Sequence, residues 1–359
     1  MRTDHRIVVG DARDLETVDD DSVELVVTSP PYPMIEMWDE VFAELDPRID
    51  ALLEAGRGRA AFDRMHAALE PAWAEVARVL VDGGIACVNV GDATRSLDGA
   101  FRVYQNHARV IEVFEALGFE PLPEILWRKP TNAATKFMGS GMLPPNAYVT
   151  LEHEYILPFR LGSTPRSFEA GADRRYRAAY FWEERNRWFS DVWTDVRGEQ
   201  QPLGDGAVRE RSAAYPLAIP FRLVSMFSVY GDTVLDPFWG TGTTTIASMV
   251  AGRHSVGIER DPGFVEAFHD RVEEVPHRSR RLATRRLADH VAFVERERAA
   301  GRSLEYRSDA YGVPVRTAQE RRLELYAVDR VEPTDDGYRA HHRRVDLPRE
   351  IVEGDGNRP

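Results

Sequence analysis

Short apolar runs alternate with longer amphipathic segments along most of the chain. The runs predicted to be strands are residues 23–27, 85–90, 122–127, 233–236 and 254–259. The segments with apolar side chains at helical spacing are residues 61–80, 109–119 and 219–228. Helices that alternate with strands predict an α/β fold with a mostly parallel sheet, covered by helices on both faces.

This alternation is interrupted once and fades before the C-terminus. Between residues 129 and 212 the pattern dissolves into Gly, Pro, Arg and aromatic residues, although residues near 151–160 are predicted to return to the sheet. Beyond residue 273 follows a charged tail with helical periodicity, whose role the sequence does not indicate. The breaks divide the chain into four parts, residues 1–128, 129–212, 213–272 and 273–359.

The composition is that of a globular protein, because hydrophobic residues make up 43% of the chain. No segment is apolar over the length that a signal peptide or a membrane span requires, so we expect a cytoplasmic protein without membrane contact. The single cysteine, Cys87, cannot form an internal disulfide. Since no histidine cluster accompanies this cysteine, we expect no metal site.

The net charge limits how the protein can meet nucleic acid. The 59 acidic and 46 basic residues give a formal charge of −13, and only Lys129 and Lys136 are lysines. Any contact with nucleic acid must therefore come from a local basic surface. Such a composition is typical of proteins from salt-loving organisms, where a Debye length of about 3 Å at 1 M salt would screen the repulsion. A GC-rich coding bias produces the same preference for arginine, and both explanations stay open.

A glycine-rich loop, D-P-F-W-G-T-G-T-T at residues 236–244, follows a predicted strand and opens a helix. Gly240 and Gly242 let the backbone come close to a ligand, and the helix N-terminus supplies free N–H donors. Glu259 ends the next predicted strand about 20 residues on, where an acidic side chain binds ribose in Rossmann-type sites. A nucleoside triphosphate P-loop is disfavoured, because Thr243 stands where that loop has lysine. Glycines that serve only the turn remain the alternative.

A second loop, T-S-P-P-Y at residues 28–32, ends the apolar run 23–27. Its two prolines fix φ and remove two N–H donors, so the loop presents carbonyl acceptors in a rigid frame. Ser29 adds a hydroxyl acceptor and Tyr32 an aromatic face. This combination suits a planar base with an exocyclic NH₂ group, although an ordinary turn would use the same residue types.

Together the two loops resemble the β group of DNA amino-methyltransferases, in which the catalytic half of the domain precedes the cofactor half. The resemblance covers residues 8–261 and includes V-V-G-D-A-R-D-L, I-L-W-R-K-P, L-E-H-E-Y-I-L and A-Y-P-L-A-I-P-F-R-L-V. The family usually begins the last of these with histidine and proline, whereas Tyr215 and Pro216 stand here. The segment of residues 128–212 also resembles members that modify the tetranucleotide CTAG.

The resemblance implies a Rossmann-like, S-adenosyl-L-methionine-dependent methyltransferase, with residues 1–128 as its catalytic half and 213–272 as its cofactor half. Residues 129–212 would be an inserted target-recognition region. Glu259 would bind the ribose of the cofactor and Asp11 would approach its adenine. The implied cofactor-binding residues are Asp11, Thr28, Asp236, Pro237, Phe238, Gly240, Thr241, Gly242, Thr243, Thr244 and Glu259. The residues implied to hold the target base are Ser29, Pro30, Pro31 and Tyr32.

Direct methylation of an amine follows from these residue types. The base would flip out of double-stranded DNA, and hydrogen bonds to Ser29 and to the Pro30 carbonyl would favour a pyramidal nitrogen. Methylation at cytosine C5 is disfavoured, because it needs a cysteine nucleophile and Cys87 lies in an apolar run. In the family, serine at the first catalytic position goes mostly with N4 of cytosine, and aspartate or asparagine mostly with N6 of adenine. Ser29 therefore favours cytosine.

Several alternatives stay open. The enzyme could methylate N6 of adenine, the acceptor could be RNA or a protein side chain, and the chain could be an inactive DNA-binding module of the same fold. As partners we expect double-stranded DNA and, for such an enzyme, a cognate restriction endonuclease; the chain would act as a monomer or a homodimer.

Basic residues interleaved with aromatics, centred on D-R-R-Y-R-A-A-Y-F-W-E-E-R-N-R-W, make residues 129–212 the expected DNA-contact region. Because Glu183 and Glu184 interrupt this run, a solvated helix with internal ion pairs is the alternative. The candidate DNA contacts are Arg128, Lys129, Lys136, Arg174, Arg175, Arg177, Arg185 and Arg187.

Overall fold

The computed structural model describes residues 1–129, 138–197 and 215–347. Lys136, one of the candidate DNA contacts, lies outside these described residues.

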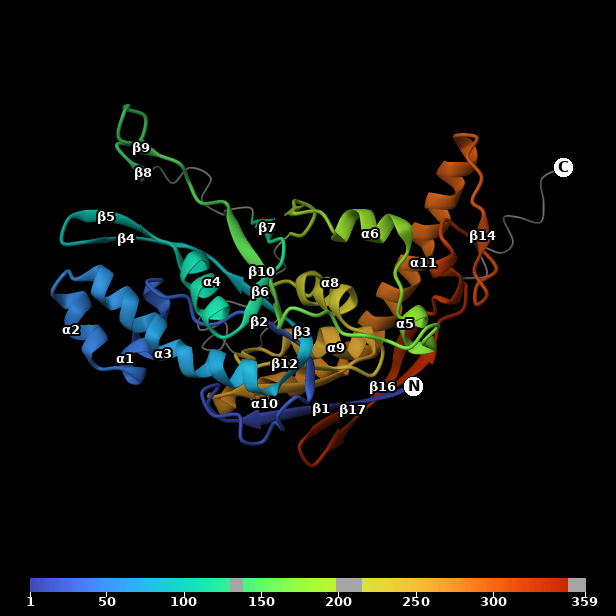
Figure 1. The fold of residues 1–359 in the computed structure, drawn as a ribbon, viewed down its shortest axis with the longest axis horizontal. Helices are drawn as coiled ribbons and strands as arrows, with labels where there is room; N and C mark the ends of the chain where they lie inside the picture. The colour runs from blue at the N-terminus through green and yellow to red at the C-terminus, as the bar shows by residue number, and fades with distance from the viewer. Residues whose placement is uncertain (130–137, 198–214, 348–359) are drawn as a thin grey trace.

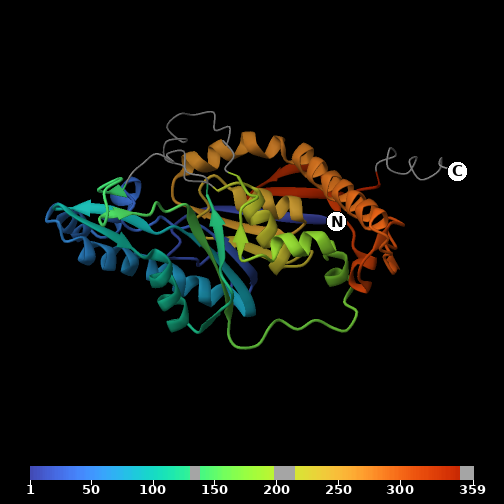
Figure 2. The same cartoon turned by 90° about the horizontal axis from the view of Figure 1, so that it is seen from above.

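A mixed sheet forms the frame of the molecule (Figures 1 and 2). Its central strands are parallel and stand in the order β3–β2–β12–β13–β1. Their bounds are β1 (Arg2–Val9), β2 (Val23–Thr28), β3 (Leu80–Val90), β12 (Thr233–Asp236) and β13 (His254–Glu259). Adjacent parallel strands end at the same edge of the sheet, so the loops after β2 and β12 begin side by side.

Mainly antiparallel strands extend the sheet on both flanks. Beside β3 lies β10 (His153–Leu161), followed by β7 (Ile125–Arg128) and β11 (Val192–Trp193), and β6 (Phe119–Pro121) also pairs with β10. Beside β1 lie β17 (Gly337–Arg344) and β16 (Tyr326–Thr334). The region predicted to be inserted therefore contributes β10 to the sheet, and the C-terminal tail contributes its other edge.

Helices cover both faces, because the strands alternate apolar side chains between the faces. In β3, Ala86 and Val88 belong to one buried cluster and Cys87 to the other. The first face carries α1 (Asp39–Leu45), α2 (Arg48–Glu54), α3 (Gly58–Val79) and α4 (Asn106–Ala116). The second face carries α8 (Ala218–Phe227), α9 (Thr243–Ala251), α10 (Pro262–Glu273) and α11 (Val275–Ala299).

Smaller elements lie around this frame. Two hairpins project at the upper left of Figure 1, where Phe101 stacks on Tyr148 with ring centroids 5.2 Å apart. They are β4 (Ala93–Leu97) with β5 (Ala100–Tyr104), and β8 (Met138–Gly139) with β9 (Ala147–Tyr148). The remaining elements are η1 (Glu36–Trp38), α5 (Asp173–Arg177), α6 (Trp182–Trp188), β14 (Tyr306–Arg307), β15 (Pro314–Val315) and η2 (Ala318–Arg322).

The C-terminal tail is tied to α6. Glu184 accepts hydrogen bonds of 2.6 and 2.8 Å from Arg286 of α11, and the carboxylate of this pair is buried. Phe181 and Leu287 pack in a third buried cluster between the same segments. The helical periodicity of the tail corresponds to α11, whereas β16 and β17 were not predicted.

The predicted α/β fold with a mostly parallel sheet and helices on both faces is confirmed, with the refinement that parallel pairing is confined to the centre and to the β7–β11 pair. No helix within the described ranges is both long and apolar enough to cross a membrane.

Gly242 closes the glycine loop at the start of α9 with a φ of 75°. A Cβ atom there would stand 2.5 Å from the Phe268 ring and 2.6 Å from the Trp239 ring. We expect Gly242→Ala to lower the free energy of unfolding by about 2–4 kcal/mol, since the left-handed conformation and overpacking both oppose a side chain. Denaturant unfolding measures this loss. Gly171→Ala is the matched control, because Gly171 has a φ of 78° with no atom within 4 Å of its Cβ position. Equal losses in the two variants would contradict the packing argument.

Candidate functional site

Two loops meet where β2 and β12 end side by side. From β2 the chain crosses through α1–α3 to β3, and from β12 it crosses through α9 to β13 on the other side. The two connections run over opposite faces. A crevice therefore opens between them, at the kind of switch point where open α/β sheets bind ligands.

Asp236 joins the two strand ends. Its Oδ1 accepts a hydrogen bond of 2.7 Å from the Thr28 hydroxyl and one of 3.2 Å from the Phe238 backbone N–H. Its Oδ2 accepts one of 2.6 Å from the Thr244 hydroxyl of α9. Burial raises the pKa of the Asp236 carboxyl to about 6, and the three hydrogen bonds limit this rise. The last residues of β2 and β12 are thus held together through a buried acid.

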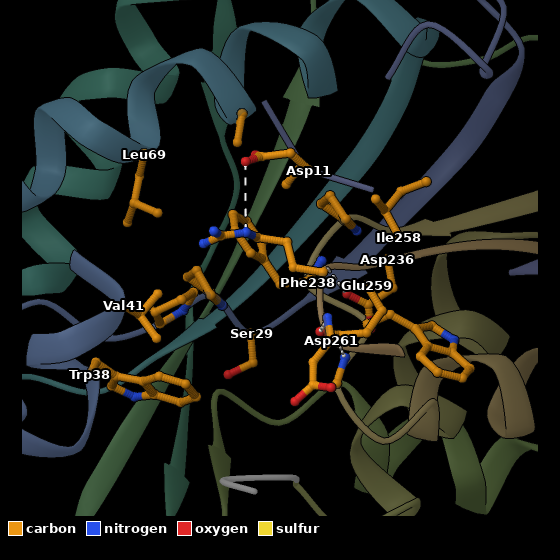
Figure 3. Close-up of a pocket in the computed structure, with 18 of the residues that line it drawn as sticks. Asp11, Ser29, Trp38, Val41, Leu69, Asp236, Phe238, Ile258, Glu259 and Asp261 are labelled. Carbon is orange, nitrogen blue, oxygen red and sulfur yellow. Dashed lines mark hydrogen bonds and ion pairs between the residues drawn. The ribbon is translucent and has the colours of Figure 1, made fainter. Parts of the chain in front are cut away.

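A cavity of about 580 Å³ opens at these strand ends. This volume lies within the range of roughly 300–1,000 Å³ that is usual for small-molecule sites. In Figure 3, Ser29 and Phe238 lie between two walls. These walls are formed by Trp38, Val41 and Leu69 on one side, and by Ile258, Glu259 and Asp261 on the other.

Most of the predicted site residues line this one cavity. Tyr32 of the first loop and Gly240 of the second share it, so the two loops are brought together. The predicted residues that line it are Asp11, Ser29, Pro30, Pro31, Tyr32, Asp236, Pro237, Phe238, Gly240, Thr241, Thr243 and Glu259. Three others stand behind the wall: Thr28 and Thr244 hold Asp236, and Gly242 lies against Phe268 and Trp239.

The second loop forms a cradle for a nucleoside. The Glu259 carboxylate accepts the N–H of Gly240 at 2.7 Å and the N–H of Asp261 at 2.9 Å, one on each oxygen. Each oxygen keeps a further lone pair for a ribose hydroxyl. Gly240 has a φ of 53°, and a Cβ there would have only the Phe238 carbonyl, at 3.9 Å, within 4 Å. Its backbone is thus open to a ligand, and Ile258 adds an apolar side chain to the same cavity.

Asp11 lines the cavity with its carboxylate already paired. Its two oxygens accept hydrogen bonds of 3.0 and 2.8 Å from the Arg13 guanidinium. These hydrogen bonds lower the pKa of Asp11, although burial opposes the shift. Asp11 is therefore held as a carboxylate at the rim, and its contact with adenine stays a prediction.

Hydrogen bonds from residues of other elements hold the first loop in place. Asn106 of α4 donates hydrogen bonds to the carbonyls of Pro33 at 3.1 Å and of Gly91 at 2.9 Å. The Ser29 hydroxyl lies 3.0 Å from the Tyr32 hydroxyl, which donates to a carboxylate oxygen of Glu154 at 3.0 Å. The serine expected to meet the target base therefore has a fixed partner and faces the cofactor cradle.

Sequence analysis missed Glu154 and Asn89 as members of the site. Glu154 lies on β10, and Asn89 on β3 donates hydrogen bonds of 2.7 Å to both Tyr32 and Glu154. The segment L-E-H-E-Y-I-L marked this part of β10 as a motif, but only the pairing of β10 with β3 brings Glu154 to Tyr32. The wall from η1, α1 and α3 was also missed, because its residues form an ordinary amphipathic pattern.

The described candidate DNA contacts fall into two groups. Arg128 and Lys129 lie at the end of β7 and face Glu152 and Glu154 of the neighbouring segment at 3.1 and 2.7 Å. The second group lies on α5 and α6, and α5 stands beside the C-terminal segment in Figures 1 and 2. Its contacts are Arg174 with Asp232, Arg175 with Phe168, Arg177 with Glu324, Arg185 with Phe189 and Arg187 with Asp195.

Two loops that share a cavity at the strand ends of a Rossmann-like sheet fit the class of S-adenosyl-L-methionine-dependent methyltransferases. Residues 23–270 match the sequence pattern of the N6_N4_Mtase family, described as DNA methylase, and the chain belongs to this family. It is accordingly an S-adenosylmethionine-dependent DNA methyltransferase. Membership in a DNA methylase family favours this function over an RNA or protein acceptor and over an inactive module.

Similar proteins support the membership of this chain in the DNA methylase family. The chain is 48% identical over 329 residues to the type II methyltransferase M.MthZI of Methanothermobacter thermautotrophicus, covering 91% of both chains. It is 49% identical over 283 residues to the type II methyltransferase M.MjaI of Methanocaldococcus jannaschii, covering 76% of this chain and 92% of that relative. Among solved structures, TTHA0409 of Thermus thermophilus in complex with S-adenosyl-L-methionine is similar with a TM-score of 0.59 and 33% identity, over 76% of this chain and 95% of that one.

The raised pKa of Asp236 has a measurable consequence for stability. Because its folded-state pKa of about 6 lies above the ordinary value of 3.8, Asp236 contributes stability that is complete below about pH 4 and lost as the pH rises through 6. The free energy of unfolding of Asp236→Asn minus that of the parent protein should therefore increase by at most about 3 kcal/mol between pH 4 and 6. Above pH 6 this difference should level off. Denaturant unfolding of the cofactor-free protein at several pH values measures this difference, and a pH-independent difference would contradict the assignment.

Proposed function

We propose that this DNA methyltransferase transfers the methyl group of S-adenosylmethionine to N4 of cytosine in double-stranded DNA. The observation that carries the proposal is the place of Ser29, whose side chain lines the same cavity as Gly240 and Glu259 of the cofactor cradle. In the family that the loop resembles, serine at this position goes mostly with cytosine. A neutral hydroxyl accepts one hydrogen of the amine without bringing a charge to the base.

The chemistry follows from the electronic structure of the amine. The lone pair of an exocyclic NH₂ group is delocalised into the ring, so the nitrogen is a poor nucleophile. Hydrogen bonds from this group to the Ser29 hydroxyl and the Pro30 carbonyl would favour a pyramidal nitrogen whose lone pair points at the sulfonium methyl. S-adenosylmethionine supplies an activated methyl group, and the residues of the chain supply position and electrostatics.

No covalent intermediate is needed for this transfer. Cys87, the only cysteine, is fully buried within β3, and burial raises the pKa of its thiol. It therefore lacks both the access and the ionisation of a nucleophile. In duplex DNA the amine is paired, so the base has to flip into the cavity at a cost of a few kcal/mol. Tyr32 and Trp38 line that cavity and offer aromatic faces.

Residues 129–212 are proposed to read the target sequence. Met142 in the β8–β9 hairpin is 83% exposed and Val149, directly after it, is 84% exposed. Tyr148 of this hairpin stacks on Phe101 of the β4–β5 hairpin. Exposed apolar groups on projecting hairpins suit contact with DNA grooves. We also propose that the target sequence is CTAG and that a restriction endonuclease is the partner of this enzyme. The names of both relatives as type II methyltransferases support the partner endonuclease.

Expression in a host that lacks DNA modification tests the target base and its site. We expect nucleoside mass spectrometry to find N4-methylcytosine in the host DNA, and sequencing that detects modified bases to locate it at CTAG. N6-methyladenine instead would overturn the assignment of cytosine, and another sequence context would overturn only CTAG. An Asp236→Ala strain serves as the control, because loss of the Asp236 carboxylate removes its hydrogen bonds to Thr28, Thr244 and the Phe238 N–H at the edge of the cavity.

Turnover and cofactor binding should depend on different loops. We expect Ser29→Ala to lower kcat by on the order of 10²-fold with an unchanged Kd for S-adenosylmethionine, because the hydroxyl acts on the base alone. Glu259→Ala should instead raise that Kd by about 10-fold or more, since it removes the ribose ligand and releases Gly240. Calorimetry measures the Kd, and methyl incorporation into DNA measures kcat. Equal turnover in Ser29→Ala and the parent would contradict the role of Ser29.

A further inference from the structure

Ser29 heads a chain of hydrogen bonds that runs away from the cavity into the sheet. Its hydroxyl is 3.0 Å from the Tyr32 hydroxyl, and the Tyr32 hydroxyl is 3.0 Å from Glu154 Oε2. Glu154 Oε1 in turn accepts a hydrogen bond of 2.7 Å from the Lys129 ammonium. Glu154 is 9% exposed. A carboxylate beneath a catalytic loop, in contact with its tyrosine, is not explained by cofactor binding.

The direction of each hydrogen bond in this chain can be assigned. Glu154, paired with Lys129, is an acceptor, so the one proton of Tyr32 points to it. Asn89 donates to both Tyr32 and Glu154 at 2.7 Å, and its amide cannot turn over without placing its oxygen against the carboxylate. Burial raises the pKa of Tyr32 well above its usual range, and the Glu154 charge adds to this, so the phenol keeps its proton.

One lone pair of the Tyr32 oxygen remains, and it faces Ser29. A hydroxyl oxygen offers one proton and two lone pairs. The Tyr32 hydroxyl donates its proton to Glu154 and accepts a hydrogen bond from Asn89 with one lone pair. It can therefore only accept, and not donate, a hydrogen bond in its contact with Ser29. The proton of Ser29 is therefore directed at Tyr32, and Ser29 presents only lone pairs to the cavity.

We infer that Glu154 is a positioning residue that acts through Tyr32 to make Ser29 an obligate hydrogen-bond acceptor, and thereby selects a base that carries an exocyclic amine. An amine offers the N–H that such an acceptor needs. A carbonyl at the same position, as in uracil or hypoxanthine, would set two acceptors against each other. The inference rests on the proposed contact of Ser29 with the target amine, but it holds equally for N4 of cytosine and N6 of adenine.

Without Glu154 this direction is lost. The Tyr32 proton could then point to Ser29, and the Ser29 proton could turn toward the base. A merely structural Glu154 would affect folding or cofactor binding, whereas a positioning Glu154 affects turnover and the choice between amine and carbonyl. These consequences are separable by experiment.

The test uses the full chain with DNA carrying the target site. We expect Glu154→Gln and Tyr32→Phe each to lower kcat by about 10- to 100-fold, with the Kd for S-adenosylmethionine unchanged within about twofold. Because both act through one hydrogen-bond chain, the double variant should be no slower than the slower single variant. Glu120→Gln, an exposed glutamate on β6, is the matched control and should retain the parent kcat.

Binding supplies a second readout. The affinity ratio between duplexes with the target base and with its keto analogue, uracil for cytosine or hypoxanthine for adenine, should fall by about 10-fold in Glu154→Gln relative to the parent. The cost of flipping each base cancels in this comparison, since it is a property of the DNA.

The inference is overturned by a parent-like kcat in either single variant, by multiplicative losses in the double variant, or by an unchanged affinity ratio. If Glu154→Gln fails to bind S-adenosylmethionine, Tyr32→Phe alone decides, because it should show both the loss of kcat and the reduced ratio. Detection of N6-methyladenine in the host DNA would overturn the choice of cytosine and leave this inference standing.

Discussion

The hydrogen bond from Thr28 to Asp236 joins the last residue of β2 to the last residue of β12, and the relative position of the two site loops depends on that junction. One strand end leads into the loop proposed to hold the base, and the other leads into the loop proposed to hold the methyl donor. Thr244 and the Phe238 N–H occupy the remaining positions around the carboxylate, so the start of α9 is tied to the same point. Burial raises the pKa of Asp236, so its ionised form is disfavoured in the folded protein. The buried acid thus lies at the point where the two loops of the cavity begin.

The antiparallel flank of the sheet has a chemical use as well as a structural one. β10 pairs with β3 so that Glu154 lies near Asn89 and beneath Tyr32. The prolines of the first loop restrict its backbone, and Asn106 links the Pro33 carbonyl after the loop to the Gly91 carbonyl after β3. The loop that carries Ser29 is therefore held by residues from two separate strands and a helix.

Few of the arginines of this acidic protein are expected to be available for contact with DNA. Many arginines neutralise acids within the molecule, as in the pairs Arg286–Glu184, Arg222–Asp195 and Arg166–Asp232. The arginine content therefore overstates the positive charge that is available to DNA. Contact with a duplex then depends on where side chains project, and the two hairpins joined by Phe101 and Tyr148 are the most prominent projections of the described chain.

The sequence by itself determined the α/β class, the glycine loop and the T-S-P-P-Y loop, because these follow from local rules. Glycine at positive φ, proline without an N–H and strand-to-helix periodicity are visible within a few residues. Tertiary structure alone decided that Glu154 lies beneath Tyr32 and that Arg177 of the predicted DNA-contact run pairs with Glu324 of the C-terminal tail. It also decided that β17, whose residues are mostly basic or polar, pairs with β1. These contacts join residues that are distant along the chain, and strand register and packing, which have no local signature, determine which of them form.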